Sequence, residues 1–467
     1  MEYRNGVIIL LLVFLWSTST TTSCSIAKTL PGFDGNLPFK LETGYVGVGE
    51  TEDVELFYYF VESQSDPSND PLLLWLNGGP GCSTFVAFFY ANGPLSFDSN
   101  YVGKLPTLKL NPYTWTKFLN VLYIDSPVGT GFSYSKSPQG YYSDDQKAAA
   151  DIYEFLQKWL INHPKFAKNR LYVGGASYSG IPTPVIVQKI YDGNEVGRKP
   201  FMNIKGYVLG SPKTDSYLDA NSRVPFAHRL TLISDELYES AKTSCNSDYV
   251  NIDPRNEQCL TDVAAINELL SGIYYSQVLL PACTSGSNSK KPNTNYYTDD
   301  GDQRIFMKTS KNFLQELWCR DHKFSIVGLW ANDPTVQEAL HIREGSKRHW
   351  ELCNSSLAYT MNIPSTIDYH QNLTNTNLRA LIYTSDHDLE IPHIGTQEWI
   401  RSLNLTLDYP WRPWFIDAQV VGYTVRYINN DFYMTYSSVK GAGHVADEYK
   451  PKEAYAMIER WFSYYPL

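Results

Sequence analysis

Short apolar runs alternate along this chain with longer stretches whose apolar residues recur at helical spacing. The runs predict buried strands, and they lie at 71–76, 121–125, 171–173, 205–209 and 378–383. Two of them are apolar at nearly every position, which is typical of strands covered on both faces. Helices are predicted between the strands, and they begin at Ser143, Ile181, Gly395 and Pro451. This alternation predicts an α/β protein with a mostly parallel central sheet flanked by helices.

Local signals refine the edges of this sheet and the start of one helix. An alternating pattern at 54–63 predicts the strand with which the sheet begins. Two further β-rich runs, 420–428 and 432–439, flank an Asn-Asn pair as the strands of a hairpin would. Ser143 and Gln146 have the spacing of a capping box, which predicts that Ser143 caps the helix that follows it.

The alternation breaks down between residues 211 and 350. This region contains four of the chain's seven cysteines and a polar tract at 284–302. We interpret 211–350 as a helical lid inserted over the sheet, with 284–304 a mobile linker that a protease could cut. The flanking segments, 26–210 and 351–467, then form the two parts of one core.

The first residues have the features of a secretory signal peptide. Arg4 precedes an apolar run at 7–16 that is too short to span a bilayer comfortably, and small residues follow it. We predict removal of residues 1–25, no later membrane anchor, and delivery to the vacuole or the extracellular space. An uncleaved anchor is the alternative. The sequons that begin at Asn354, Asn372 and Asn404 agree with the secretory route.

Composition and charge narrow the classes of partner. The 467-residue chain is 43% hydrophobic and 19% charged, with a formal net charge of −10 and no basic cluster, which disfavours nucleic acid and anionic membranes as partners. Without Cys24, which lies in the predicted signal, the cysteines are even in number and suit disulfides in an oxidising compartment. None has the C-x-x-C spacing of a zinc site, which disfavours zinc. We expect neither a metal nor another cofactor.

The stretch 171–180, LYVGGASYSG, has the layout of a nucleophile elbow: a strand, a turn of small residues, a serine and a helix. Small neighbours are needed because the serine occupies a strained backbone conformation. Ser177 is therefore the candidate nucleophile, and the N–H of Tyr178 is a candidate oxyanion donor. The motif's usual last glycine is Ser179 here, so a plain serine in a strand-to-helix turn is the alternative.

An acid and then a histidine follow the serine along the chain in this arrangement. Asp388 lies in the loop after the last predicted parallel strand before the hairpin, and His444 lies in a glycine-flanked loop after the hairpin. We predict that His444 is the general base and then the general acid, and that Asp388 orients its ring. The competing candidates, expected to be structural or surface residues, are Asp386, His387 and His393.

The loop 77–81, NGGPG, offers a glycine-rich backbone that can approach a ligand closely. We predict that the N–H of Gly79 is the second oxyanion donor. The loop could also cradle a phosphate, but it lacks the lysine and the Ser/Thr of a P-loop, which disfavours that alternative.

Several motifs together resemble the serine carboxypeptidase family: WLNGGPGCS, DSPVGTGFSYS, GGASYSG, SDHD and KGAGH. LETGYVGVGE, KGYVLGSPKTD and LWANDPTVQEALHIREG are similar to the plant serine carboxypeptidase-like proteins, among which acyltransferases that use glucose esters are common. The resemblance covers essentially the whole mature chain and implies an α/β-hydrolase fold with a disulfide-stapled helical lid. It also implies substrate-binding roles for Asn77 and Gly78, and the disulfides Cys82–Cys353, Cys245–Cys259 and Cys283–Cys319.

The chain departs from the carboxypeptidases that it resembles at two positions. In those enzymes an asparagine and two acidic side chains hold the peptide's terminal carboxylate; Asn77 matches the asparagine, but Ala176 and Ala91 replace the acids. A hydrogen bond to a charged group contributes roughly 1.5–3 kcal/mol, so losing two would weaken productive peptide binding on the order of 10²–10⁴-fold. The acyltransferase relatives usually carry an aspartate at the position of Ala176, so acceptor binding cannot be carried over from that position.

The sequence therefore leads to the hypothesis of a serine-dependent acyltransferase. It would move an acyl group from a 1-O-glucose ester, or a similar activated ester, to an alcohol through an acyl-enzyme on Ser177. The alternatives are a serine carboxypeptidase or other hydrolase, and a catalytically silent scaffold. The expected partners are the small-molecule donor and acceptor, and the protein itself is expected to be a monomer or a heterodimer nicked in its linker.

Overall fold

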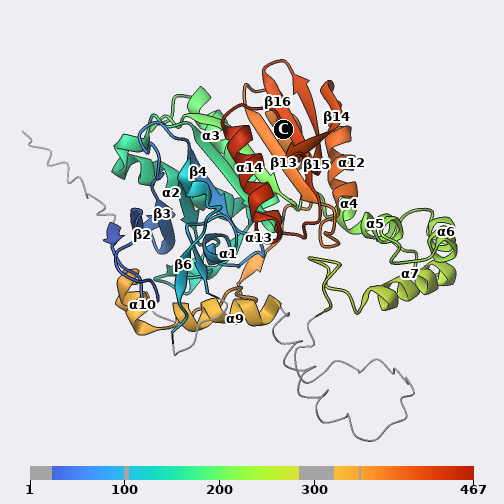
Figure 1. Ribbon diagram of the computed structural model, residues 1–467, viewed down its shortest axis with the longest axis horizontal. Coiled ribbons are helices and arrows are strands. Elements are labelled where there is room, and N and C mark those ends of the chain that lie inside the picture. The colour runs from blue at the N-terminus through green and yellow to red at the C-terminus, as the bar shows by residue number, and fades with distance from the viewer. Residues whose placement is uncertain (1–23, 99–104, 283–319, 347–348) are drawn as a thin grey trace, which may run out of the picture.

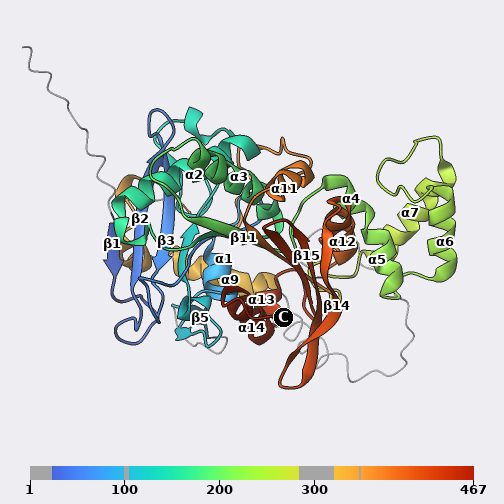
Figure 2. The same cartoon turned by 90° about the horizontal axis from the view of Figure 1, so that it is seen from above.

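The computed structural model describes residues 24–98, 105–282, 320–346 and 349–467. Within these residues one twelve-stranded sheet crosses the molecule in the order β1-β2-β3-β7-β4-β10-β11-β13-β16-β15-β14, with β8 (Tyr134–Ser135) beside β3 (Figures 1 and 2). The strands from β7 to β16 are parallel, and antiparallel pairs extend both edges. The predicted strands are all present in this mostly parallel sheet.

The bounds of the strands follow the apolar runs closely. The parallel strands are β7 (Asn120–Ile124), β4 (Leu72–Leu76), β10 (Leu171–Ala176), β11 (Ile204–Gly210), β13 (Arg379–Ser385) and β16 (Phe432–Val439). The antiparallel strands are β1 (Cys24–Ala27), β2 (Leu41–Val48) and β3 (Val54–Val61) at one edge, and β15 (Gln419–Asn429) and β14 (Thr406–Ile416) at the other.

Strand alternation divides the core into two layers, one on each face of the sheet. Leu72 and Leu74 of β4 belong to one hydrophobic cluster, and Leu73 and Trp75 belong to the other. The first cluster is covered by α2 (Asp145–Asn162), α3 (Pro182–Glu195), α11 (Ile367–Leu373) and α12 (His393–Ser402). The second is covered by α1 (Phe85–Tyr90), α9 (Arg320–Ala331), α10 (Pro334–Ala339), α13 (Ala446–Tyr449) and α14 (Pro451–Phe462).

The predicted cap of α2 is wrong by one residue. The side chain of Asp144, not Ser143, accepts a hydrogen bond of 2.8 Å from the N–H of Lys147. Ser143 instead pairs with Tyr359 in a short two-stranded ladder. Asp and Ser are almost equally good caps, so a sequence in which they are adjacent does not decide between them.

The region predicted as a lid separates into two parts in the described residues. The helices α4 (Ser216–Asn221), α5 (Arg223–Arg229), α6 (Asp235–Ser244) and α7 (Glu257–Leu270) continue from β11, and Figures 1 and 2 show α6 and α7 projecting away from the sheet. The helices α9 and α10 instead pack against the core near α1. The predicted linker 284–304 and the cysteines Cys283 and Cys319 lie outside the described residues.

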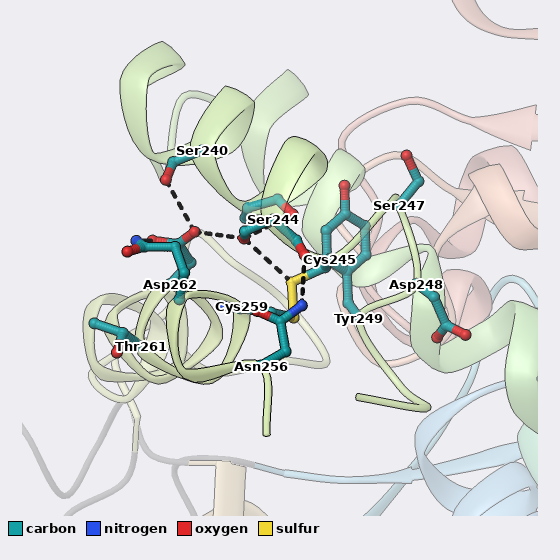
Figure 3. The surroundings of a disulfide bond; sticks show 12 residues. Ser240, Ser244, Cys245, Ser247, Asp248, Tyr249, Asn256, Cys259, Thr261 and Asp262 are labelled. Atoms are coloured by element: carbon teal, nitrogen blue, oxygen red, sulfur yellow. Dashed lines mark hydrogen bonds between the residues drawn. A yellow bond between two sulfur atoms is a disulfide. The ribbon is translucent and has the colours of Figure 1, made fainter. Parts of the chain in front are cut away.

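The predicted disulfide Cys245–Cys259 ties the end of α6 to α7 (Figure 3). Polar contacts surround it: Asp262 accepts hydrogen bonds from Ser240 Oγ at 2.9 Å and from Ser244 Oγ at 2.7 Å. Both helices also contribute to a small hydrophobic cluster, which they share with α5 and with Leu389 of the loop after β13. The projecting part of the chain is therefore held together by a covalent link as well as by packing.

The predicted signal lies almost wholly outside the described residues, so its removal stays a prediction. None of the described helices has both the length and the apolar character needed to cross a membrane. Two of the predicted glycosylation sites, Asn372 and Asn404, are exposed. The third, Asn354, is half-buried, and its side-chain N–H donates to the carbonyl oxygen of Gly129 at 3.0 Å.

Candidate active site

Strand β10 leads directly into the predicted nucleophile. Ser177 follows its last residue with φ of 62°, begins the short 3-10 helix η4 (Ser177–Gly180), and is followed by α3. A positive φ is uncommon for a residue other than glycine, and it raises the side chain out of the line of the strand. This is the backbone conformation expected for a nucleophile elbow.

The small residues before Ser177 are required by the neighbouring strands. A Cβ atom on Gly175 would lie 2.6 Å from the carbonyl oxygen of Leu76 in β4, and one on Gly174 would lie 2.9 Å from that of Val208 in β11. Ser179, where the motif usually has glycine, donates a hydrogen bond of 2.7 Å to the carbonyl oxygen of Ala176. This serine therefore adds a hydrogen bond within the turn.

A buried carboxylate anchors the elbow through the residue that follows the nucleophile. The Tyr178 hydroxyl donates to Oδ1 of Asp145 at 2.6 Å, and the Tyr359 hydroxyl donates to the same oxygen at 2.7 Å. Burial and the hydrogen bond to Asp145 raise the pKa of the Tyr178 hydroxyl. This contact connects the elbow to the first turn of α2, and no helical periodicity indicates it.

The predicted acid occupies a fully buried position after β13. Oδ1 of Asp388 accepts hydrogen bonds from the main-chain N–H groups of Glu390 at 2.9 Å and Ile391 at 3.2 Å. Its other oxygen, Oδ2, lies 2.8 Å from Nδ1 of His444. Asp388 therefore has both oxygens engaged, and one of them orients the imidazole through Nδ1.

His444 lies in the loop between β16 and α13, and its exposed fraction is 7%. Its main-chain N–H donates to the carbonyl oxygen of Ser276 at 2.6 Å. A Cβ on Gly443 would lie 2.9 Å from Cβ of Gln277, so this glycine lets the chain approach closely. With Nδ1 turned toward Asp388, Nε2 is the ring nitrogen through which a proton would be exchanged with a nucleophile.

Residues 275–278, which follow α7, support both of these loops. The carbonyl oxygen of Tyr275 accepts from the N–H of Leu389 at 2.9 Å, and the N–H of Val278 donates to the carbonyl oxygen of His387 at 3.1 Å. Together with the bond from His444 to Ser276, these contacts attach the projecting region to the acid loop and the histidine loop. The sequence reasoning missed this segment because main-chain hydrogen bonds can form with almost any residue type.

Ser177 and His444 line the same cavity, which has a volume of about 1000 Å³. Asn77, Gly78, Gly79 and Ala176 line it too. Its far wall consists of one face of α9 and the segment after α10, with the residues Phe324, Ser325, Gly328, Leu329, Asn332, Trp350 and Leu352. The structure therefore brings the predicted serine and histidine together at one concave site, at the carboxyl ends of the parallel strands.

The glycine-rich loop lies directly against the elbow. A Cβ on Gly78 would be 2.6 Å from Cβ of Ser177 and 3.0 Å from the main-chain nitrogen of Tyr178. Gly79 has φ of 119°, a conformation that strongly favours glycine, and it lines the cavity. The two predicted oxyanion donors, Gly79 and Tyr178, thus belong to segments that meet beside Ser177.

A second buried carboxylate and the predicted disulfide hold this loop in place. Oδ1 of Asp125, at the end of β7, accepts from Ser83 Oγ at 2.8 Å and from the N–H of Thr84 at 2.9 Å. Burial raises the pKa of the Asp125 carboxyl group. The predicted bond Cys82–Cys353 is present and joins the loop to the cavity wall. An acid at the carboxyl end of an apolar strand was a visible signal for Asp125.

The two alanines that replace the expected acids occupy different surroundings. Ala176 lines the cavity beside Ser177, whereas Ala91 is buried at the C-terminal end of α1 and is not part of the cavity lining. The acids in the lining are Asp333 and Glu351, and lysine and arginine are absent from its described residues. Hydrogen bonds from Thr335 lower the pKa of Asp333, which favours its charged form.

The competing acid and histidines do not line the cavity. Oδ1 of Asp386 accepts a hydrogen bond of 2.6 Å from the N–H of Gly441, which is the kind of structural contact expected for it. His387 contacts the histidine loop through its main-chain N–H, which donates to the carbonyl oxygen of Ala442 at 3.0 Å. His393 begins α12, and burial lowers its pKa to about 4.

Comparison with proteins of known structure supports the fold. Kex1(delta)p, a prohormone-processing carboxypeptidase from Saccharomyces cerevisiae, superimposes with a TM-score of 0.70 at 19% sequence identity, and the match covers 91% of each chain. The predicted α/β-hydrolase fold, with a mostly parallel sheet between two layers of helices, is therefore confirmed.

Comparison of sequences supports a narrower relationship. Serine carboxypeptidase-like 17 of Arabidopsis thaliana is 45% identical over 449 residues, which cover 95% of this chain and 94% of the relative. Serine carboxypeptidase-like 7 of the same plant is 44% identical over 467 residues, which cover 100% of this chain and 99% of the relative. The profile of the serine carboxypeptidases matches residues 31–464. The chain therefore belongs to the serine carboxypeptidase family.

Proposed function

We propose that this member of the family is an acyltransferase, which moves an acyl group from a 1-O-glucose ester to an alcohol. The observation that carries this proposal is the charge of the cavity. Ala176, not an acid that could share a proton with a carboxylate, adjoins Ser177, and the charged groups in the described lining are acidic. Asp333 and Glu351 would repel the terminal carboxylate of a peptide, whereas a neutral ester meets no such repulsion.

The volume of the cavity also suits two neutral substrates. A cavity of about 1000 Å³ lies at the upper end of the range found for small-molecule sites. It is large enough to hold an acyl group with its glucose, or an acyl group with a second alcohol. The apolar wall provided by Phe324, Leu329 and Leu352 favours the acyl part of such an ester.

The first half of the proposed reaction forms an acyl-enzyme. His444 takes the proton of Ser177 through Nε2 while Oγ attacks the ester carbonyl, and a C–O bond forms. The negative charge on the carbonyl oxygen is stabilised by the N–H groups of Gly79 and Tyr178. The bond to glucose then breaks, and the proton on His444 passes to the departing glucose oxygen. Asp388 stabilises the imidazolium throughout this half-reaction.

The second half returns the enzyme to its starting state. An alcohol binds where glucose was, gives its proton to His444 and attacks the acyl carbonyl. The bond to Ser177 breaks, and its oxygen recovers the proton from His444. Transfer predominates over hydrolysis when the acceptor occupies the site and excludes water, which is a matter of positioning.

A labelling experiment tests whether the serine is active at all. The purified protein should react with a fluorophosphonate probe, and Ser177→Ala should abolish the label. Ser271→Ala, at the exposed end of α7, is the matched control and should label like the parent. Absence of labelling in a folded parent protein would support the silent-scaffold alternative.

A competition between substrates tests the type of reaction. The protein is incubated with 1-O-acyl glucose esters and a panel of alcohols, and separately with a blocked dipeptide. We expect ester exchange that depends on Ser177, with slow or absent release of the C-terminal amino acid. Rapid release of that amino acid without ester exchange would replace this proposal with a carboxypeptidase.

We also propose that the protein reaches the vacuole or the extracellular space through the secretory pathway. The exposed sequons at Asn372 and Asn404 support this route, because both could accept a glycan without unfolding. N-terminal sequencing of the protein from tissue should find residues 1–25 removed, and an endoglycosidase should increase its mobility. An intact N-terminus without glycans would contradict this route.

A further inference from the structure

A second cavity lies at the opposite end of the sheet from the catalytic residues. It has a volume of about 810 Å³ and shares no lining residue with the first cavity. Arg379, the first residue of β13, lines it, whereas Asp388 follows the other end of that strand. Seven residues of extended strand separate these ends by about 20 Å, so the second cavity is remote from the reacting groups.

The strand register places three arginines on one side of this cavity. Arg379 pairs with Tyr433 of β16, Arg426 of β15 pairs with Tyr409 of β14, and Arg412 of β14 pairs with Thr424. These side chains belong to the face of the sheet toward α14, because Met434 and Val425, which alternate with them, are in the core on the other face. The residues that follow α14, including Tyr464 and Tyr465, complete the lining.

Aromatic rings hold the three guanidinium groups in position. Cζ of Arg379 lies 3.9 Å from the ring centroid of Trp461 and 4.1 Å from that of Tyr464. Cζ of Arg426 lies 4.3 Å and Cζ of Arg412 lies 5.0 Å from the centroid of Tyr409, which therefore serves both. Planar stacking of this kind orients guanidinium donors before a ligand arrives.

Few acceptors are available to these donors. Arg426 pairs with Asp408 at 2.5 Å, and Nη2 of Arg379 donates to the carbonyl oxygen of Trp461 at 2.7 Å. Nη1 of Arg379 and Nη1 of Arg412 are buried with no hydrogen-bond partner among the described residues. In a chain of net charge −10, three arginine side chains thus line a single cavity, and Asp408, the acid paired with Arg426, is not among its lining residues.

We propose that this second cavity is a binding site for a small aromatic carboxylate. The carboxylate would accept hydrogen bonds from Arg412 and Arg379, and the ligand's ring would stack against the exposed tyrosines of the lining, Tyr409 and Tyr433. The size of the cavity fits a ligand of this class. The site is independent of the proposed acyl transfer, because none of its residues takes part in that reaction.

Binding is measured by isothermal titration with Ser177→Ala protein, so that no turnover at the first cavity contributes. The probes are 4-hydroxybenzoate, inorganic phosphate and benzyl alcohol, which separate the anionic from the aromatic part of the ligand. We expect saturable binding of 4-hydroxybenzoate and at least tenfold weaker binding of the other two. The proposal would be overturned if benzyl alcohol or phosphate bound as tightly as 4-hydroxybenzoate. It would also be overturned if 4-hydroxybenzoate showed no saturable binding up to 10 mM, a concentration that corresponds to a binding free energy on the order of −3 kcal/mol.

Variants then place the ligand. Arg412→Gln should weaken 4-hydroxybenzoate binding at least tenfold, and Arg412→Lys should weaken it less because it keeps the charge but loses the fork. Arg412 makes no ion pair in the described residues, so its replacement should leave the thermal unfolding midpoint nearly unchanged, which is checked in parallel. Arg255→Gln, an exposed site beyond α6, is the control of equal charge change. Binding that is the same in Arg412→Gln and Arg255→Gln would place the ligand elsewhere and refute the assignment.

Discussion

Replacing Asp447 with asparagine should stabilise the folded protein above pH 7. Asp447 lies in α13, three residues after His444, and its exposed fraction is 3%. Oδ2 accepts a hydrogen bond of 3.1 Å from Nδ2 of Asn92, whose Oδ1 accepts one of 3.0 Å from the Tyr123 hydroxyl. Oδ1 of Asp447 is buried and has no partner among the described residues. This carboxylate is therefore costly to ionise.

The sign and size of the effect follow from its pKa. Burial raises the pKa of Asp447 from 3.8 to about 7. At a pH between these two pKa values, the carboxyl group of Asp447 has lost its proton in the unfolded chain but keeps it in the folded protein. Stability therefore falls as pH rises through this window and is constant above it. A difference of about three pKa units corresponds to roughly 4 kcal/mol at pH 7 and above.

Asparagine is never charged and so avoids this loss. Its oxygen can accept from Asn92 as Oδ2 does, but its amide would occupy the position of the unpartnered Oδ1, at a cost of about 1–3 kcal/mol. We therefore expect Asp447→Asn to gain about 1–3 kcal/mol of unfolding free energy at pH 8, and to lose about 1–3 kcal/mol near pH 4, where only the cost of the amide remains.

Urea unfolding at pH 5, 6, 7 and 8 measures this prediction. The parent should lose stability across the series, and Asp447→Asn should lose less. Asp431→Asn, in the exposed turn between β15 and β16, is the matched control and should follow the parent at every pH. If Asp447→Asn had the parent's pH dependence and no gain at pH 8, the carboxylate would not be neutral and buried as argued.

Three further predictions concern the active site and the projecting helices. Asp388→Asn should lower kcat by about 10³–10⁴-fold while leaving the circular dichroism spectrum unchanged, because the imidazole would lose its orienting charge; a loss below tenfold would contradict that role. Gly78→Ala should reduce the rate of fluorophosphonate labelling at least tenfold, since the added Cβ would lie 2.6 Å from Cβ of Ser177; labelling at the parent's rate would show that the loop moves freely. Replacing both Cys245 and Cys259 with serine should lower the unfolding free energy by about 3 kcal/mol in chemical denaturation, for a loop closed over a sequence separation of 14; an unchanged value would show that packing alone holds α6 to α7.

The sequence predicts the sheet well because its strands are short, apolar and separated by helices. Each of the short apolar runs is a parallel strand in the structure, and the predicted hairpin beside Asn429 is present. The strand β14 escaped notice because its eleven residues include two prolines and mostly exposed side chains. β14 is held in the sheet by its antiparallel pairing with β15, and the pattern of residues within β14 does not indicate that pairing.

The candidate site could be predicted in part, because the order of serine, acid and histidine along the chain indicates which loops carry them. Ser177, Asp388 and His444 were each predicted from a loop at the end of an apolar strand, and the structure places Oδ2 of Asp388 2.8 Å from Nδ1 of His444. Asp145 was not found, because its role as an anchor depends on Tyr178 and Tyr359, which approach it only in the folded chain. No local pattern marks an acid that two distant tyrosines will reach.

The segment after α7 changes how the projecting helices should be understood. A lid that only covers a site could move without changing the positions of the catalytic groups. This segment is different, because it hydrogen-bonds to the loops that carry Asp388 and His444. Movement of α6 and α7 would be transmitted through Ser276 to the main chain of His444, whose N–H donates to it at 2.6 Å. The loops that carry Asp388 and His444 are therefore held by main-chain contacts from the inserted region as well as by the sheet.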